Sequence, residues 1–336
     1  MKKITHKIII LLTGLLMACS AAPTTEVPVT ATATAQPAPT QTVAISPTTA
    51  LMPTRTSTKF VWKASPASGG FTGIAVDQQG NLYVVGYSTN KIYKLDSSGK
   101  LLTQWGEPGT DKSQFDGPAG IAVDQTGSVY VADHNNNRVQ VFDSNGKFLN
   151  QWGTSGKEAG QFSGPDIVAV DSEGSIYVTE DRNYRVQKFD HTGRFVMQWG
   201  SQGSGDGQFG DPTGLAIDPQ GNIYVADYIL NRIQKFDKQG NFLLKWGAPG
   251  KEDGKFNGPS ALALDAKGNL YVADYENHRI QKFDSEGHFL LQWGGRGRQD
   301  GQFDRPWGIA LDGQGNIYVS EYGNSRIQKF SLNTSP

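Results

Sequence analysis

The feature that most constrains this chain is a repeat with a spacing of 47 residues. One well-defined copy begins at Gly120 and reads GIAVD-QTGS-VYVAD-HNNN-RVQVFD-SNGK-FLNQWG, and a glycine-rich passage ending at Pro165 follows it. The aspartate that closes the first segment occurs in six copies, at Asp77, Asp124, Asp171, Asp218, Asp265 and Asp312. A residue present in every copy serves a need that arises six times, so the repeat predicts a scaffold.

Each copy contains four apolar runs of about five residues, of the types GIAVD, IYVAD, RIQKFD and FLLQW. Gly- and Asn-containing turns, such as residues 77–81, separate these runs, which is typical of antiparallel strands. The first run is apolar on both faces and therefore suits an inner strand, whereas the fourth suits the outer edge. Six such sheets around an axis predict an all-β fold, a six-bladed β-propeller of four-stranded antiparallel blades.

The two ends of the repeat array predict how the ring closes. The sixth copy stops after its third run, Ile327–Phe330, and lacks the FLLQW segment. A similar segment, KFVW at residues 59–62, precedes the first copy. We therefore expect the N-terminal strand to complete the sixth blade. One tryptophan per blade is expected on the fourth strand, at Trp62, Trp105, Trp152, Trp199, Trp246 and Trp293.

The N-terminus predicts export. A basic segment, MKKITHK, precedes an apolar run, Ile8–Met17, that is too short to span a bilayer as a helix. The following residues, Leu-Met-Ala-Cys19, resemble the lipobox of bacterial lipoproteins, whose cysteine is lipidated on sulfur and becomes the new N-terminus. An ordinary cleaved signal with an incidental cysteine is the alternative. Because Cys19 is the only cysteine, no intramolecular disulfide is possible.

These patterns predict three segments. Residues 1–19 are a lipoprotein signal peptide with the lipobox cysteine. Residues 20–58 are dominated by Thr, Pro, Ala and Ser and are expected to form a disordered tether, because they bury too little apolar surface to offset the entropy of ordering. Residues 59–336 form the propeller. The expected location is extracytoplasmic, lipid-anchored to a bacterial membrane.

The repeats resemble the NHL-repeat family over residues 59–336. The resemblance rests on phrases such as PTGLAID at 212–218, GNIYVAD at 221–227 and NRIQKFD at 231–237. It implies a six-bladed propeller, usually a binding platform. Members include tripartite-motif ubiquitin ligases that hold RNA or protein, extracellular sensor domains of bacterial kinases, and a peptide-amidating lyase with a metal site, so the fold does not choose among functions.

Features that recur in at least five of the six copies are interpreted as scaffold. Acid–arginine pairs flank the loop between the second and third runs, at Asp133/Arg138, Glu180/Arg185, Asp227/Arg232, Asp274/Arg279 and Glu321/Arg326, whereas the first copy has Gly86 and Lys91. Such pairs are expected to fix loop geometry. Asp77 and its equivalents are expected to cap turns. No helix follows the glycine-rich passages, which disfavours a phosphate-binding loop, and the phenylalanines that end them (Phe115, Phe162, Phe209, Phe256, Phe303) are expected in the core.

Two columns differ among the copies, and both are expected on one face of the propeller. The start of the first strand carries Thr72, Ala119, Asp166, Thr213, Ser260 and Trp307, and the loop between the second and third strands carries Tyr87, His134, Asp181, Tyr228, Tyr275 and Tyr322. We call this face, together with the neighbouring Arg182 and Arg305, the variable face. Tyrosine, tryptophan and arginine are enriched where proteins make energetic contacts. The Arg305-Pro-Trp307 segment lies across the ring from Asp166, so a cleft with unlike walls is expected.

We therefore predict a binding site formed by Tyr87, His134, Asp166, Asp181, Arg182, Tyr228, Tyr275, Arg305, Trp307 and Tyr322, with no catalytic residue, metal or cofactor. The four exposed tyrosines and Trp307 are expected as contacts. The net charge of −1 and the absence of a long basic run disfavour nucleic acid. The expected partner is a protein, peptide or glycan of the cell envelope, bound by a monomeric propeller, and binding is favoured over an enzymatic activity. The alternative is a hydrolase or lyase using calcium or another metal at the central channel; no histidine occurs at an inner-strand position, but Asp166, Glu180 and Asp181 share one sector.

Overall fold

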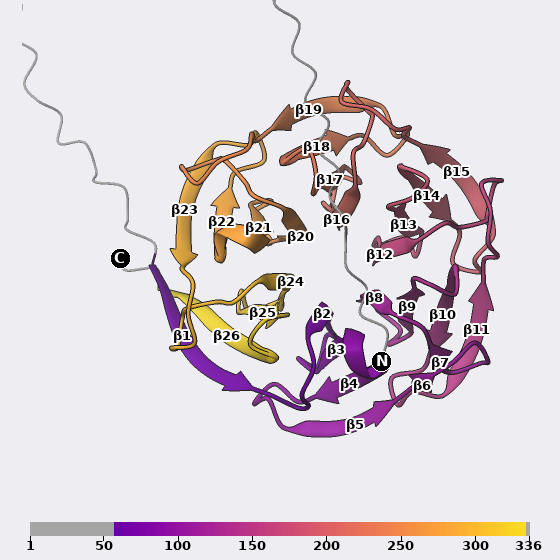
Figure 1. Ribbon diagram of the computed structural model, residues 1–336, viewed down its shortest axis with the longest axis horizontal. Coiled ribbons are helices and arrows are strands. Elements are labelled where there is room, and N and C mark those ends of the chain that lie inside the picture. The colour runs from indigo at the N-terminus through magenta and orange to yellow at the C-terminus, as the bar shows by residue number, and fades with distance from the viewer. Residues whose placement is uncertain (1–56, 334–336) are drawn as a thin grey trace, which may run out of the picture. The chain divides into compact units, whose positions relative to one another are not determined.

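The computed structural model describes residues 57–333, and within them six four-stranded antiparallel sheets form a ring (Figure 1). From the axis outward, blade 1 is β2 (Phe71–Val76), β3 (Leu82–Gly86), β4 (Lys91–Leu95) and β5 (Leu101–Trp105), and blade 2 is β8 (Pro118–Val123), β9 (Val129–Asp133), β10 (Arg138–Phe142) and β11 (Phe148–Trp152). Blade 3 is β12 (Pro165–Val170), β13 (Ile176–Glu180), β14 (Arg185–Phe189) and β15 (Phe195–Trp199), and blade 4 is β16 (Pro212–Ile217), β17 (Ile223–Asp227), β18 (Arg232–Phe236) and β19 (Phe242–Trp246). Blade 5 is β20 (Pro259–Leu264), β21 (Leu270–Asp274), β22 (Arg279–Phe283) and β23 (Phe289–Gly294), and blade 6 is β24 (Pro306–Leu311), β25 (Ile317–Glu321), β26 (Arg326–Asn333) and β1 (Ser57–Ala64).

The predicted six-bladed architecture is confirmed. Short elements supplement the blades: β6 (Glu107–Pro108) pairs with β7 (Gln114–Phe115), and two 3₁₀ turns span Tyr87–Thr89 and Tyr275–Asn277. The second strand of every blade is fully buried, while the fourth alternates between exposed and half-buried residues, as expected for an edge strand with one face in water. No helix of the described residues is long and apolar enough to cross a membrane.

The predicted ring closure is also confirmed. Strand β1 pairs antiparallel with β26, from Ser57 opposite Asn333 to Ala64 opposite Ile327, so the sheet at the C-terminal end gains its fourth strand from the N-terminal end (Figure 1). The strand begins two residues before the predicted start at residue 59. The predictions for residues 1–56, including Cys19 and most of the tether, lie outside the described residues.

Trp62 does not occupy the backbone position that the other five tryptophans share. In blade 2, Trp152 lies opposite Val139, whereas in blade 6 the equivalent Ile327 faces Ala64 and Trp62 lies opposite Lys329. The ring nevertheless lies 6.1 Å from Tyr318, much as Trp152 lies 6.3 Å from Tyr130. In addition, its indole N–H donates to the Ser97 carbonyl of blade 1 at 3.1 Å. The closing strand therefore seals the junction between blades 6 and 1 from a shifted register.

The core lies between adjacent blades. One cluster joins Tyr130 and Val139 of blade 2 to Ile176 and Phe189 of blade 3. Phe162, which ends the glycine-rich passage, is fully buried there, as predicted, with its ring 5.5 Å from Phe189. Because each blade covers the face of the next, no blade buries its apolar surface alone, which is the cooperative logic of a closed repeat array.

Each acid–arginine pair holds the passage that connects two blades. Arg138 donates from Nε to Asp133 at 2.8 Å and from its terminal nitrogens to the carbonyls of Thr110, Asp111 and Gln114. Gln140 donates to the Gln114 carbonyl as well. The structural interpretation of these pairs is supported, but the arginine fixes the passage before its blade in addition to its own loop. Blade 1 follows only a short connection, residues 65–70, which explains why it lacks the pair.

The aspartate of the first turn also has the predicted structural role. Asp77 accepts backbone N–H groups of Gln79 and Asn81 at 3.0 and 2.8 Å. Its second oxygen accepts the hydroxyl of Tyr83 at 3.1 Å. The same aspartate thus caps the turn and accepts a hydrogen bond from the buried tyrosine of the second strand. Asp124 and Tyr130 repeat this arrangement in blade 2.

Candidate binding site on the variable face

The two variable columns lie on the same face, as predicted, because backbone hydrogen bonds join them. The N–H of Tyr228 donates to the Asp211 carbonyl at 2.9 Å, and the N–H of Tyr322 donates to the Arg305 carbonyl at 3.0 Å. The same bond joins Asp181 to Gly164 at 3.1 Å. The loop between the second and third strands is therefore tied to the residue that precedes each inner strand.

Several loop side chains extend over the beginning of the next blade. Tyr228 of blade 4 covers Gly258 of blade 5, where an added Cβ would lie 2.6 Å from the tyrosine ring. Similarly, His134 of blade 2 reaches Gly164 of blade 3, where a Cβ would lie 3.1 Å from Nε2. These loop side chains thus reach from one blade to the next, and we call the six loop residues together the circle of loop side chains.

One side of this circle is aromatic. The ring of Trp307 lies 5.2 Å from Tyr275, edge to face, and 6.5 Å from Tyr228. The guanidinium of Arg305 lies 5.9 Å from the centre of the Tyr275 ring and 3.6 Å from the carboxylate of Glu276. We call Tyr228, Tyr275 and Trp307 the aromatic wall.

The neighbouring tyrosines of the circle form a separate pair. Tyr87 and Tyr322 lie 6.4 Å apart with their rings edge to face. Tyr87 is 37 % exposed and Tyr322 is half-buried. Of the four tyrosines expected to be exposed, Tyr87 is exposed, whereas Tyr228 and Tyr322 are half-buried. The expectation is wrong for Tyr275, which is only 8 % exposed, because Trp307 and Arg305 pack on it.

The other side of the circle is acidic. His134 Nε2 lies 3.1 Å from Asp181 Oδ2, and Arg182 Nε lies 3.9 Å from Asp181 Oδ1. Asp166 is buried, with only 7 % of its surface exposed. Burial, together with the charge of Asp181, raises the pKa of Asp166 to about 7, although His134 acts in the opposite direction. Burial lowers the pKa of His134, but its hydrogen bond to Asp181 and the charges of Asp166 and Asp181 outweigh this effect and raise it.

Asp211 belongs to the same acidic side and was missed by the sequence interpretation. Burial and the charges of Asp166, Asp181 and Asp227 raise the pKa of Asp211 to about 8. Its backbone N–H donates to Asp227 at 3.0 Å. The signal was available in the sequence: most copies have glycine before the inner strand, and Asp211 and Arg305 depart from it. We call Asp166, Asp181, Asp211 and His134 the acid pocket.

The channel beneath this circle is apolar. A cavity with a volume of about 60 Å³ touches the innermost strands of all six blades, and Trp307 lies at its rim. Its other lining residues are aliphatic or glycine: Gly73, Ile74, Ile121, Ile167, Val168, Leu215, Ala261, Leu262, Gly308 and Ile309. These side chains offer no carboxylate or imidazole. They do not fit a metal held inside the channel, since calcium and zinc need oxygen, nitrogen or sulfur ligands.

The same holds more widely, because no group of three His, Cys, Asp or Glu residues between positions 57 and 333 is arranged to hold a metal ion. Among the four side chains of the acid pocket, His134 and Asp181 are in contact, at 3.1 Å. Acid–base chemistry or the binding of a positively charged group remains open to this arrangement.

The family comparisons agree with the repeat. A family described as "NHL repeat" matches residues 115–142, 256–283 and 303–330, and one described as "6-bladed beta-propeller" matches residues 166–249. A family described as "Beta-propeller repeat" matches residues 72–94. The chain is a six-bladed β-propeller that carries NHL repeats. No curated protein matches it significantly in sequence.

Solved structures extend this similarity at the level of fold. A catalytically inactive virginiamycin B lyase from Staphylococcus aureus, crystallised with quinupristin, is 18% identical, with a TM-score of 0.56 and coverage of 80% of this chain and 83% of that chain. A protein of unknown function from Bacteroides thetaiotaomicron is 18% identical, with a TM-score of 0.64 and coverage of 83% and 76%. A gluconolactonase from Xanthomonas campestris is 15% identical, with a TM-score of 0.58 and coverage of 79% and 87%. At these identities the likeness shows the fold alone.

Proposed function

We propose that this protein is a membrane-anchored, extracytoplasmic binding platform for a protein, peptide or glycan partner, which docks on the variable face. The observation that supports it is the concentration of departures from the repeat on that one face. The aromatic wall and the acid pocket adjoin there, through the contact of Tyr228 with Asp211, and the channel beside them is lined by apolar residues. The acids that repeat elsewhere in the blades form ion pairs or hydrogen bonds within the scaffold, as Asp133 does with Arg138.

The aromatic wall suits an interface. Trp307 is half-exposed, and its ring packs edge to face on Tyr275. Rigid aromatic side chains that are partly covered lose little conformational entropy on binding and often carry most of the interface energy. In this proposal the lipid on Cys19 supplies the membrane attachment, and the propeller acts as a monomer without a cofactor or nucleic acid.

The test is capture of partners from cell envelopes by the wild-type protein and two tryptophan variants. Trp307→Ala should weaken partner capture about thirtyfold, which corresponds to about 2 kcal/mol, while the melting temperature stays nearly unchanged. Trp199→Ala is the matched control, because the half-buried Trp199 packs on Tyr177 and Phe236 at the edge of the core between blades 3 and 4. It should lower stability first and capture only in consequence. Wild-type capture by Trp307→Ala would place the interface elsewhere.

The second candidate is a hydrolase or lyase. The contact between His134 and Asp181 beside the buried Asp166 favours it, because a histidine held by a carboxylate is a common general base. A gluconolactonase and a lyase of the same fold show that this scaffold supports such chemistry in other proteins. Because the residues that line the channel do not fit a metal, we derive no metal-dependent step. Turnover of gluconolactone or quinupristin that disappears in His134→Gln would favour the enzyme over the platform.

A further inference from the structure

The acid pocket contains carboxyl oxygens that the protein leaves without partners. The side chain of Asp166 makes no hydrogen bond to any residue between positions 57 and 333, although the residue is only 7 % exposed. Asp181 Oδ1 and Asp211 Oδ1 are buried and also lack a hydrogen-bond partner among the described residues. Buried polar groups are normally paired, and an unpaired carboxylate is costly. The three carboxyl groups therefore call for a bound group that can donate to them.

The charged groups nearby do not meet this need. His134 contacts the other oxygen of Asp181, at 3.1 Å. Arg182 lies 3.9 Å from Oδ1, too far for a hydrogen bond, and its side chain is 52% exposed. By contrast, the buried Asp274 receives Arg279, Asn277 and a backbone N–H. The pocket is thus an exception in a molecule whose other repeated acids are neutralised.

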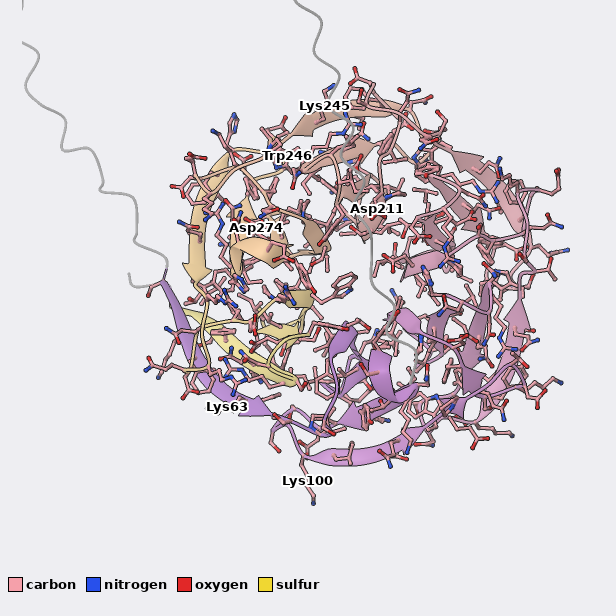
Figure 2. The ribbon with its side chains drawn as sticks, in the orientation of Figure 1. Lys63, Lys100, Asp211, Lys245, Trp246 and Asp274 are labelled. Carbon is pink, nitrogen blue, oxygen red and sulfur yellow. The ribbon has the colours of Figure 1, made fainter. Side chains whose placement is uncertain are left out.

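The position of Asp211 brings the acid pocket to the aromatic wall. Its carbonyl accepts the N–H of Tyr228, whose ring lies 6.1 Å from Tyr275 and 6.5 Å from Trp307. Figure 2 shows Asp211 on the inner side of blade 4, with Lys245 of the same blade at the rim. Carboxylates next to aromatic faces suit a cation, which gains charge-assisted hydrogen bonds and cation–π attraction together. Arg305 already places a guanidinium over Tyr275 on this wall.

We propose that the acid pocket binds the ammonium or guanidinium group of a lysine or arginine side chain presented by a peptide partner, with the aromatic wall covering the aliphatic part of that side chain. This inference rests on the proposed function and names the chemistry of the partner. A lysine ammonium group has three N–H donors and an arginine guanidinium group has five, so one such group can donate a hydrogen bond to each of the three carboxyl groups. The cation replaces the missing hydrogen-bond partners of Asp166, Asp181 and Asp211.

Titration of the pocket sets the conditions of the test. Burial raises the pKa of Asp166 to about 7 and that of Asp211 to about 8. The other charged groups that face them are Asp181, Asp227 and His134, with Arg182 at the edge. A cation binds the ionised carboxylates, so affinity should increase between pH 6 and pH 8.5, where a lysine ammonium group is still charged.

The experiment is calorimetric titration of the full-length protein in detergent at pH 8.5. The ligands are tetralysine, tetraarginine and a tetralysine whose four side-chain amines are acetylated and therefore uncharged. Tetralysine or tetraarginine should bind, and acetylated tetralysine should not. Asp166→Asn and Asp211→Asn, which keep the side-chain shape, should each weaken binding about tenfold or more. Glu173→Gln removes an exposed carboxylate from the turn on the opposite face and should bind as wild type. This control separates the pocket from general attraction to negative charge.

The inference is overturned if acetylated tetralysine binds as tightly as tetralysine, or if both aspartate variants bind with wild-type affinity. It is also overturned if Ca²⁺ binds in a way that depends on Asp166 while the peptides fail to bind. An amino sugar that binds where both peptides fail would also reject it, in favour of a glycan. The proposed function fails separately, if Trp307→Ala captures envelope partners like wild type. If Trp307→Ala loses envelope partners but the wild type binds neither tetralysine nor tetraarginine, the proposed function stands and the proposed cation is refuted.

Discussion

At the scale of single residues, the buried acids of the propeller fall into two groups, those with an arginine partner and those without. Arg279 donates to Asp274 at 2.8 Å and to three carbonyls of the preceding passage. We expect Arg279→Met to lower the free energy of unfolding by about 3–5 kcal/mol, because it leaves a buried carboxylate uncompensated. Lys91→Met changes the equivalent position of blade 1, where no acid faces it, and should cost less than about 1 kcal/mol. Urea unfolding measures both, and equal losses would contradict the passage-holding role.

Asp166 represents the second group, and its titration predicts how stability depends on pH. Burial raises its pKa to about 7, whereas an aspartate of the unfolded chain titrates near 3.9. Because the folded state holds the proton more tightly, the contribution of Asp166 to stability is fully present below about pH 4 and is lost as pH rises towards 7. Asp166→Asn cannot ionise, so it should be more stable than wild type at pH 8, by about 2–4 kcal/mol. Unfolding curves at pH 4, 6 and 8 measure this, and an unchanged pH profile in the variant would show that Asp166 is not the responsible group.

At the scale of elements, strand β1 closes the ring. Trp62 packs on Tyr318 and donates to Ser97 of the neighbouring blade, whereas the adjacent Val61 is 46% exposed. Trp62→Ala should therefore destabilise the propeller by about 3–5 kcal/mol, through lost burial at the junction. Val61→Ala should cost less than about 1 kcal/mol. Thermal unfolding compares them, and a Trp62→Ala variant that melts with wild type would contradict the closing role of the strand.

The same element shows where sequence reasoning succeeds and where it ends. The last copy lacks its fourth run, and a similar run precedes the first copy. This was enough to predict that β1 pairs with β26, because the repeat shows how many strands each blade needs. The register shift between Phe60 and Trp62 was not, since it depends on how the closing strand packs against its neighbours. Likewise, the variable columns predicted the face, but the burial of Tyr275 follows from its contacts with Arg305 and Trp307 of the next blade, which the repeat pattern does not reveal.

At the scale of the whole molecule, the residues that repeat in the blades build the ring, and the residues that differ among the blades form the candidate binding site. Three features recur around the ring and hold the blades together. They are the arginine hydrogen bonds to the passages between blades, the buried tyrosines, and the aromatic packing between blades. The irregular residues meet only where the loops surround the channel. A rigid ring holds an acid pocket and an aromatic wall in fixed relation, and this fixed relation reduces the entropy lost when a partner binds.

The proposed membrane anchor belongs to this scale as well, because it decides where the variable face can meet a partner. The lipobox-like segment ending at Cys19 is the basis for it. Cys19→Ser removes the only thiol and should abolish lipid attachment. Each buried methylene contributes roughly 0.8 kcal/mol, and stable anchoring needs more than one acyl chain. The variant should therefore move from the detergent phase to the aqueous phase in phase separation, and radiolabelled fatty acid should mark only the wild type. Cys19→Ala is the matched second variant, and unmodified wild-type protein in the aqueous phase would remove the anchor from the proposal while leaving the binding face to be tested on its own.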